Sequence, residues 1–170
     1  DSMTKREDKK QLIMAKALAI FAEKGYYKTT TAEIARAAGV TQPYIFHFFA
    51  NKEELYIKVT EGAFMRLYDT FKHAKASKDH LFETMGNAFI QMMKTHYDET
   101  LLLMQAYSIS EPLIREQVRT KFQAVHRLVL EKFKEANHPQ AEVAASHFMA
   151  MGLLITVSEV LDLPEMLCLK

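Results

Sequence analysis

Gln42, Tyr44 and His47 lie close together in the sequence and carry side chains that can hydrogen-bond to a second molecule. The glutamine amide donates and accepts at once, which matches the edge of a base pair, whereas hydroxyl and ammonium groups reach phosphate oxygens. A short helix offering such groups from its first turns suits the major groove of double-stranded DNA. The predicted base contacts are Gln42, Pro43, Tyr44 and His47, and the predicted phosphate contacts are Thr29, Thr30, Thr31, Tyr44 and Lys52.

Two short helices with a tight turn between them would hold these residues outward. The first is predicted to begin at a capping box, in which the Thr30 hydroxyl accepts a hydrogen bond from the Glu33 amide and the Glu33 carboxylate reaches back. Gly39 supplies the positive φ that a sharp exit from this helix requires.

The second helix is predicted over about residues 42–49. Thr41 is a good N-cap for it, and Pro43 is tolerated because it falls in the first turn. Ile45 and Phe49 lie four residues apart and can both face the core. The polar side chains of the same helix then point outward, which is the geometry of a helix-turn-helix.

The stretch from Thr29 to Leu55 resembles the N-terminal DNA-binding domain of the TetR family of one-component repressors. The matching residues are Thr30-Thr31, Glu33-Ile34-Ala35, Ala38-Gly39-Val40-Thr41, Ile45-Phe46-His47-Phe48-Phe49 and Asn51-Lys52-Glu53-Glu54-Leu55. Residues 17–31 resemble that family's first helix and its exit. The family usually has tyrosine at the position of Phe46, where the hydroxyl meets a phosphate. Phe46 cannot make this hydrogen bond, so the interaction is absent or passes to Tyr44.

The resemblance also implies how the protein works. Members of this family bind small, often hydrophobic, inducers in a larger helical domain and usually dimerise through their last two helices. It therefore implies a homodimer, joined through its C-terminal helices, that represses transcription from a palindromic operator in double-stranded DNA. A small hydrophobic effector would release it, by shifting the fourth helix and changing the separation of the two reading helices.

Other functions stay open on sequence grounds. A helix pair with glycine in the turn can be ordinary packing, and a ligand-binding or scaffold protein could use its helix-turn-helix to contact protein. A helical enzyme is a weaker alternative. None of the seven histidines is paired with another at helical spacing, and Ser108 and Ser110 lack the turn of a nucleophile elbow. We therefore expect no enzyme activity, no metal site and no cofactor.

The composition favours an all-α protein. Hydrophobic residues make up 49% of the 170, and only five glycines and four prolines interrupt them. We predict a three-helix helix-turn-helix domain over residues 1–51 and a helical ligand-binding and dimerisation domain over residues 52–170. The single cysteine, Cys168, excludes an internal disulfide and suits a cytoplasmic protein. The longest apolar run, residues 148–157, is too short to span a bilayer, so no membrane contact is expected.

Charge is distributed unevenly along the chain. Residues 1–58 hold ten Lys or Arg against seven Asp or Glu, a net of +3, whereas residues 59–170 carry a net of −2. The basic excess thus accompanies the helix-turn-helix, as expected for a DNA-binding unit. Residues 1–10 are polar and expected to fray. Their basic side chains either reach phosphates or form a solvated arm, two interpretations that the sequence favours equally.

Helical spacing of apolar residues predicts the other helices. They cover about residues 5–24, 51–75, 80–97, 99–108, 111–136 and 140–161. Asp79 is the expected N-cap of the third of these. The last is apolar nearly all round between residues 148 and 157, so it must be covered on more than one side. A second subunit is the expected cover, with a fully enclosed monomer helix as the alternative.

Methionine and aromatic side chains in the larger domain could line an adaptable apolar cavity. The predicted pocket residues are Met85, Phe89, Met92, Met93, Tyr97, Met104, Tyr107, Phe122, Phe148 and Met149. Each of them could instead be ordinary core packing. The family resemblance implies that some form the effector pocket.

Overall fold

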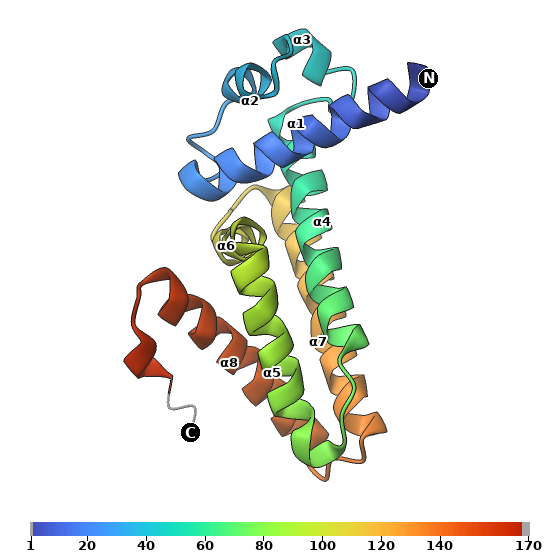
Figure 1. The fold of residues 1–170 in the computed structure, drawn as a ribbon, viewed down its shortest axis with the longest axis vertical. Helices are drawn as coiled ribbons and strands as arrows, with labels where there is room; N and C mark the ends of the chain where they lie inside the picture. The colour runs from blue at the N-terminus through green and yellow to red at the C-terminus, as the bar shows by residue number, and fades with distance from the viewer. Residues whose placement is uncertain (1, 168–170) are drawn as a thin grey trace.

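The computed structural model describes residues 2–167, which form helices joined by short loops (Figure 1). The helices are α1 (Ser2–Lys24), α2 (Thr31–Ala38), α3 (Gln42–Ile45), α4 (Lys52–His73), α5 (Lys78–Thr95), α6 (Tyr97–Ala106), α7 (Pro112–Glu135) and α8 (Ala141–Val160), with a final 3₁₀ turn η1 (Pro164–Met166). No strand occurs in this part of the chain, which confirms the predicted all-α class. Cys168 lies outside the described residues.

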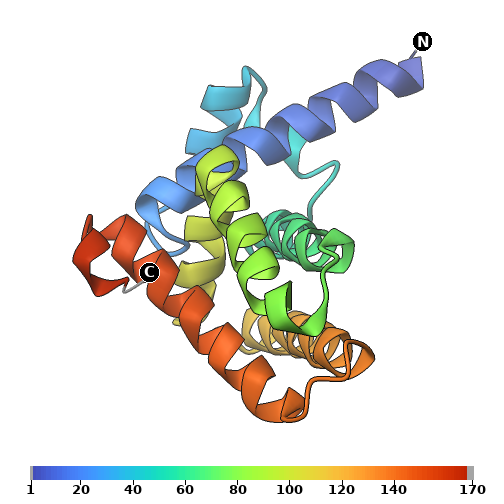
Figure 2. The ribbon, with the colours of Figure 1, turned by 60° about the horizontal axis from the view of Figure 1, so that its bottom comes forward.

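α1 is longer at its N-terminal end than the sequence indicates. Fraying is expected over the first ten residues, yet the helix begins at Ser2 and its first turns project from the body (Figures 1 and 2). No glycine or proline interrupts it, and the Gln11 amide donates to the Glu7 carboxylate one turn earlier at 2.8 Å. The later turns pack inward through Ile13, Ala17 and Phe21.

α2 has both predicted ends. The Glu33 amide donates to the Thr30 hydroxyl at 3.2 Å, and the Glu33 carboxylate accepts from the Thr30 amide at 3.0 Å, which confirms the capping box. Gly39 ends the helix in the left-handed conformation, with φ of 65°. These local devices set the direction in which the chain leaves α2 toward α3.

α3 is shorter than predicted, because it ends at Ile45 and not at Phe49. Beyond it, the amides of His47 and Phe48 donate to carbonyls three residues back, so the chain tightens into turns. The Phe49 amide still donates to the Ile45 carbonyl at 3.1 Å. Phe49 therefore keeps the buried position that the helical prediction assigned to it.

α4 joins the helix-turn-helix unit to the rest of the molecule. It packs against α1 at its start and against α5, α6 and α7 farther along (Figure 1). Its residues Leu55 and Tyr56 belong to the same hydrophobic cluster as Phe64 and Phe71. Because the core is continuous along α4, the division at residues 51 and 52 stays a prediction.

The helical body consists of α5 to α8 with the later turns of α4. α7 lies along α4, and α8 packs against α5, α6 and α7 (Figures 1 and 2). α5 begins earlier than predicted, with Ser77 as its N-cap residue. The expected cap, Asp79, lies inside the first turn, where its negative charge favours the positive end of the helix dipole.

α8 is the most apolar helix of the molecule. By length and composition alone its 20 residues could cross a membrane, a test that the core helix of a globular protein also passes. In its most apolar stretch, 33% of the residues are buried. One side of α8 packs on three helices. Val143, Leu153 and Leu161 remain 47%, 44% and 60% exposed. An apolar face is therefore open along this helix.

Candidate DNA-binding surface and apolar cavity

The start of α3 carries an exposed polar surface opposite a buried apolar one. Ile45 and Phe49, 0% and 2% exposed, fix the α3 segment to the core. The predicted base-reading residues on the opposite side are the exposed Gln42, Pro43 and His47 and the half-buried Tyr44. The structure thus brings the four together on one segment.

Gln42 is held by the neighbouring helix. Its side-chain amide donates to the Thr31 hydroxyl of α2 at 2.7 Å. A glutamine amide has two N–H donors and a carbonyl acceptor, so one donor and the acceptor remain for a second partner. This hydrogen bond restricts the rotamers of Gln42 and leaves the pair of groups that a bidentate contact with adenine uses.

Two of the predicted phosphate contacts have structural roles. Thr29 is 1% exposed and donates its hydroxyl to the Gly25 carbonyl at 2.7 Å. Thr31 is 8% exposed and accepts from Gln42. Both hydroxyls satisfy groups inside the fold, which disfavours the phosphate contacts predicted for Thr29 and Thr31. Thr30 is exposed, but its hydroxyl is engaged in the α2 cap.

Lys52 lies at the start of α4 and connects it to the loop before α2. Its Nζ donates to the Tyr26 carbonyl at 2.8 Å and lies 4.3 Å from the centroid of the Tyr26 ring. An ammonium group has three donors, so this contact does not exhaust its capacity for hydrogen bonds. These contacts stabilise the junction between α4 and the loop before α2. The phosphate contact of Lys52 stays a prediction.

The first turns of α1 lie beside α3. Lys5, Arg6 and Lys9 line an open groove together with Tyr44, His47 and Phe48. The Arg6 guanidinium carbon lies 5.3 Å from the centroid of the Phe48 ring, in cation–π contact. The sequence left open whether these basic residues reach phosphates or form a solvated arm, and the structure places three of them beside the predicted base-reading residues. The signal in the sequence was their pairing at four-residue spacing, which only matters once α1 is known to be helical there.

An apolar cavity of about 200 Å³ lies in the helical body. Six of the ten predicted pocket residues line it: Phe89, Met104, Tyr107, Phe122, Phe148 and Met149. Met85, Met92 and Met93 do not line it but are buried in the core, and Tyr97 is 41% exposed at the start of α6. Sequence periodicity separates buried from exposed residues, but it does not separate residues around a cavity from residues in close packing.

Other lining residues were not predicted. They are Leu67, Phe71, Thr100, Leu103, Val125, Gly152, Leu153, Thr156 and Val157. The two threonine hydroxyls donate to carbonyls four residues earlier in their own helices, at 3.2 Å for Thr100 and 2.8 Å for Thr156. Their donors are therefore used within the fold, and the cavity wall is largely hydrocarbon.

Tyr107 forms part of the cavity wall where it meets the surface. Its ring packs edge-on against Phe122, with centroids 5.2 Å apart. The residue as a whole is 44% exposed, yet burial raises the pKa of its hydroxyl to about 12. The phenol therefore stays protonated near neutral pH and can donate one hydrogen bond.

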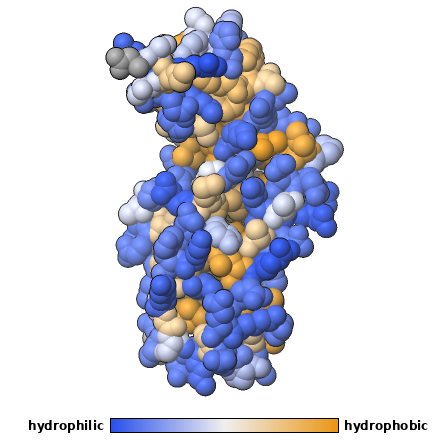
Figure 3. All heavy atoms as spheres, turned by 90° about the vertical axis from the view of Figure 1, so that its right-hand side faces the viewer, coloured by the Kyte–Doolittle hydropathy of each residue, from blue (hydrophilic) through white to orange (hydrophobic). Residues whose placement is uncertain are grey.

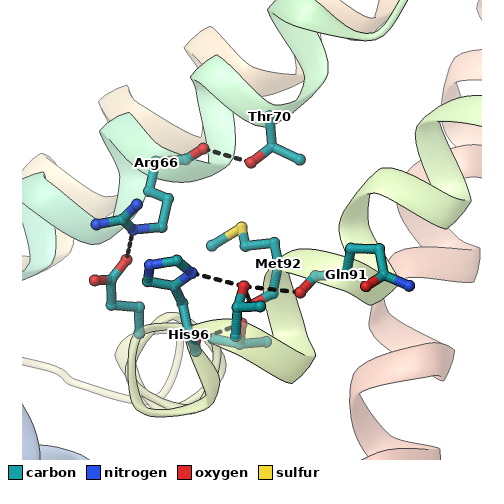
Figure 4. A network of polar contacts seen from close by, with 8 residues as sticks. Arg66, Thr70, Gln91, Met92 and His96 are labelled. Carbon is teal, nitrogen blue, oxygen red and sulfur yellow. Dashed lines mark hydrogen bonds and ion pairs between the residues drawn. The ribbon is translucent and has the colours of Figure 1, made fainter.

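A polar cluster ties α4 to the α5–α6 junction beside the cavity (Figure 4). The Arg66 guanidinium donates to the Glu99 carboxylate, and the His96 ring nitrogen lies 2.8 Å from the Thr95 hydroxyl. The His96 carbonyl in turn accepts from the cavity residue Thr100. A partly exposed ion pair contributes little stability by itself, so the cluster chiefly orients α6 relative to α4.

α6 also contacts the helix-turn-helix unit directly. The Gln105 amide donates to the Ala22 carbonyl near the end of α1 at 2.8 Å. After α6, the Ser110 hydroxyl lies 3.2 Å from the Tyr27 hydroxyl. Since Leu103 and Met104 line the cavity, a single helix touches both the cavity and α1.

The arrangement defines a class of protein: a helix-turn-helix unit with an outward polar segment, set on a helical body that encloses an apolar cavity. Within residues 2–167, no group of three or more His, Cys, Asp or Glu side chains could hold a metal ion. The family model described as bacterial regulatory proteins, tetR family, matches residues 13–59. The match covers the helix-turn-helix unit, so this part of the chain is a DNA-binding domain of the tetR type.

Several known proteins are similar over most of the chain. FasR of Mycolicibacterium smegmatis, an HTH-type transcriptional activator, is 23% identical over 152 residues, which cover 88% of this chain and 68% of FasR. FadR from Bacillus subtilis in complex with stearoyl-CoA superposes with a TM-score of 0.74 at 17% identity, covering 89% of this chain and 88% of FadR. AibR in complex with isovaleryl coenzyme A and operator DNA gives 0.73 at 18% identity, with 88% and 86% covered. These structures share the fold.

Proposed function

We propose that the protein is a cytoplasmic, homodimeric repressor that binds a palindromic operator and leaves it when a small hydrophobic ligand occupies the body. The observation that carries the proposal is the exposed segment from Gln42 to His47, which Ile45 and Phe49 hold outward. Two such segments, one from each subunit, would enter successive major grooves about 34–36 Å apart. Gln42, Pro43, Tyr44 and His47 contact bases in this proposal, and Thr30, Tyr44 and Lys52 contact phosphates.

The proposed ligand is an acyl compound, such as an acyl-CoA. The cavity wall is largely hydrocarbon, and its volume of about 200 Å³ suits a short chain without rearrangement. Similar proteins bind isovaleryl coenzyme A and stearoyl-CoA. A stearoyl chain would require the cavity to open, and the accessible edge formed by Tyr107 and Leu153 is the place where it would do so.

Two helices can carry the ligand's effect to the DNA-binding unit. α4 contributes Leu67 and Phe71 to the cavity and packs on α1 at its other end. α6 lines the cavity and holds the Ala22 carbonyl through Gln105. A ligand that displaces either helix would change the separation of the two α3 segments. A tenfold loss of affinity requires only about 1.4 kcal/mol of differential binding.

Selection of duplexes from a random DNA library tests the proposed DNA binding. The wild-type chain should enrich a palindromic motif. Gln42→Ala and His47→Ala should bind the same duplexes with relaxed preference at particular positions, since a good base contact contributes about 1–3 kcal/mol of discrimination. Thr120→Ala, an exposed site on α7, serves as the control and should leave the motif unchanged. Enrichment of no sequence by the wild type would exclude sequence-specific binding.

Thermal unfolding with added ligand tests the proposed effector class. Isovaleryl-CoA and stearoyl-CoA should each raise the melting temperature in a concentration-dependent manner if they bind the folded state, and coenzyme A alone should not. Adding the same acyl-CoA to the protein–DNA complex should then release the duplex. Equal shifts with coenzyme A and its acyl esters would show that the cavity is not an acyl site.

A further inference from the structure

Charged residues at the start of α1 are sorted by sign around the helix axis. Lys5 and Lys9 are four residues apart, as are Arg6 and Lys10, so these basic residues share an arc of about 140°. Glu7 and Asp8 fall on the opposite side, and all six residues except the half-buried Lys10 are exposed. A helix that contacts only solvent does not require its positive and negative side chains to lie on opposite sides. One side of this helix therefore presents positive charge alone.

The basic side of these first turns continues the packing side of α1. Ile13, Ala17 and Phe21 occupy the same arc farther along the helix, and each is 0% exposed. The face is thus apolar where the protein covers it and basic where α1 extends past the core. Apart from the α3 segment along one edge, the described part of the chain places no element over the first two turns, so this face is open to a partner outside the subunit that carries negative charge.

The position of the basic face points to the partner's identity. Lys5, Arg6 and Lys9 share one groove with Tyr44 and His47, and the Arg6–Phe48 contact holds the two elements side by side. At the top of Figure 3, where α1 begins, strongly hydrophilic residues lie next to a hydrophobic area. A duplex seated on α3 would bring its phosphodiester backbone to this groove.

We propose that the first turns of α1 form a second DNA-contacting element, in which Lys5 and Lys9 bind phosphates of the same duplex that α3 reads. Arg6 positions this element through Phe48 and contributes further positive charge. The contact is electrostatic and independent of sequence, since ammonium groups on phosphates carry no base information. This inference rests on the proposed DNA-binding function and adds a contact that the helix-turn-helix alone does not supply.

The test compares the full-length wild type with the double variant Lys5→Gln/Lys9→Gln on a duplex enriched by the wild type. Both side chains are exposed and neither is hydrogen-bonded to another of the residues 2–167, so helix content by circular dichroism should be unchanged. The plot of log K against log salt concentration has a negative slope, and its magnitude should decrease by about 0.9 for each phosphate that the variant no longer binds. Two lysines in each of two subunits make four such contacts, so the expected decrease for a dimer is about 3.6. The base preferences of the variant should equal those of the wild type.

Lys75→Gln/Lys78→Gln is the matched control, because it removes the same two charges per subunit from exposed sites at the far end of the body. It should leave the slope unchanged. Substituting single phosphates of the duplex by neutral methylphosphonates then locates the contact. The wild type should lose affinity at one or two adjacent phosphates in each half-site, and the double variant should be insensitive at those same positions.

Two results would overturn the inference. One is a slope for the double variant equal to that of the wild type. The other is an altered base preference with an unchanged slope, which would mean that the lysines act through α3. Either can occur while the wild type still selects a palindromic motif, so failure of this inference is distinguishable from failure of the proposed function.

Discussion

Tyr56 shows how a single residue can pack well and still carry an unsatisfied group. Its ring is 1% exposed and lies edge-on to Phe21 and at a steep angle to Tyr26, with centroids 5.0 Å away in both cases. Its hydroxyl and that of neighbouring Thr60 have no hydrogen-bond partner of acceptable geometry among the described residues. Burial raises the pKa of the Tyr56 hydroxyl well above its usual value, so the phenol stays neutral.

Replacing Tyr56 by Phe should leave the free energy of unfolding unchanged or raise it by up to about 1 kcal/mol, because an unpaired buried hydroxyl is removed and the ring contacts stay. Tyr56→Ala should lower it by about 3–5 kcal/mol through loss of the ring. Urea denaturation followed by circular dichroism measures both. A clear loss of stability in Tyr56→Phe would reveal a hydrogen bond, for example through a buried water.

Glu33 combines a helix cap with an ion pair. Its carboxylate accepts from Lys24 and from the Thr30 amide, and these contacts hold the pKa of Glu33 at about 2, below its ordinary 4.5. A depressed folded-state pKa stabilises the fold above the unfolded-state pKa. This stabilisation decreases as pH falls below about 4.5 and is gone once pH has passed about 2.

Glu33→Gln should therefore be less stable than the wild type at pH 7, and the two should converge as pH approaches 2. Glutamine can keep the capping geometry, so the variant isolates the charge. Urea midpoints between pH 2 and pH 7 measure the effect. A difference that stays constant over this range would mean that the carboxylate charge is not its source.

At the scale of elements, five helices of the body enclose the cavity, and Gly152 lies in its wall on α8. A Cβ added at Gly152 would meet no atom within 4 Å, and the same holds for Gly62, which is exposed on α4 and does not line the cavity. Both glycines occupy helix interiors, where glycine is less stable than alanine. Comparing an alanine variant at each glycine therefore distinguishes an effect on helix stability from an effect on the shape of the cavity.

Gly152→Ala and Gly62→Ala should each raise the free energy of unfolding by about 0.5–1 kcal/mol. Only Gly152→Ala reduces the cavity, so only this variant should show a smaller thermal shift with isovaleryl-CoA. Differential scanning calorimetry with and without the ligand measures both effects. A reduced ligand shift in Gly62→Ala as well would place the ligand outside the cavity.

At the scale of the whole molecule, α8 presents an open apolar face that no other described residue covers. Val143, Ala150 and Leu161 lie within one narrow arc of the helix and are exposed. A two-fold partner would pair this face with itself, as isologous dimers do. The same contact would set the separation between the two α3 segments and therefore the spacing of the half-sites.

Ala150→Glu should make the protein monomeric, because a carboxylate at the centre of an apolar interface would be buried without a partner. The small exposed site should tolerate the change within the subunit. Analytical ultracentrifugation at micromolar concentration measures the mass, with Ala19→Glu on the exposed side of α1 as the control. If Ala150→Glu sediments with the wild-type mass, the interface lies elsewhere.

The sequence alone determined the features that depend on neighbouring residues. The capping box of Thr30 and Glu33, the left-handed exit at Gly39 and the inward pair Ile45 and Phe49 involve residues no more than four apart. Such contacts form within one turn, so spacing predicts them. The all-α class follows similarly from the long apolar periodicities with few breakers.

Only the tertiary structure decided features that depend on contacts between distant residues. Lys52 meets the Tyr26 carbonyl across 26 positions of the chain, and Gln105 meets the Ala22 carbonyl across 83. The choice of cavity-lining residues is of the same kind, since Met85 and Phe89 are both buried on α5 but only Phe89 meets the opening between five helices. Spacing along a helix says which side faces inward. How several inward sides meet, and where they leave space, depends on packing that no local pattern records.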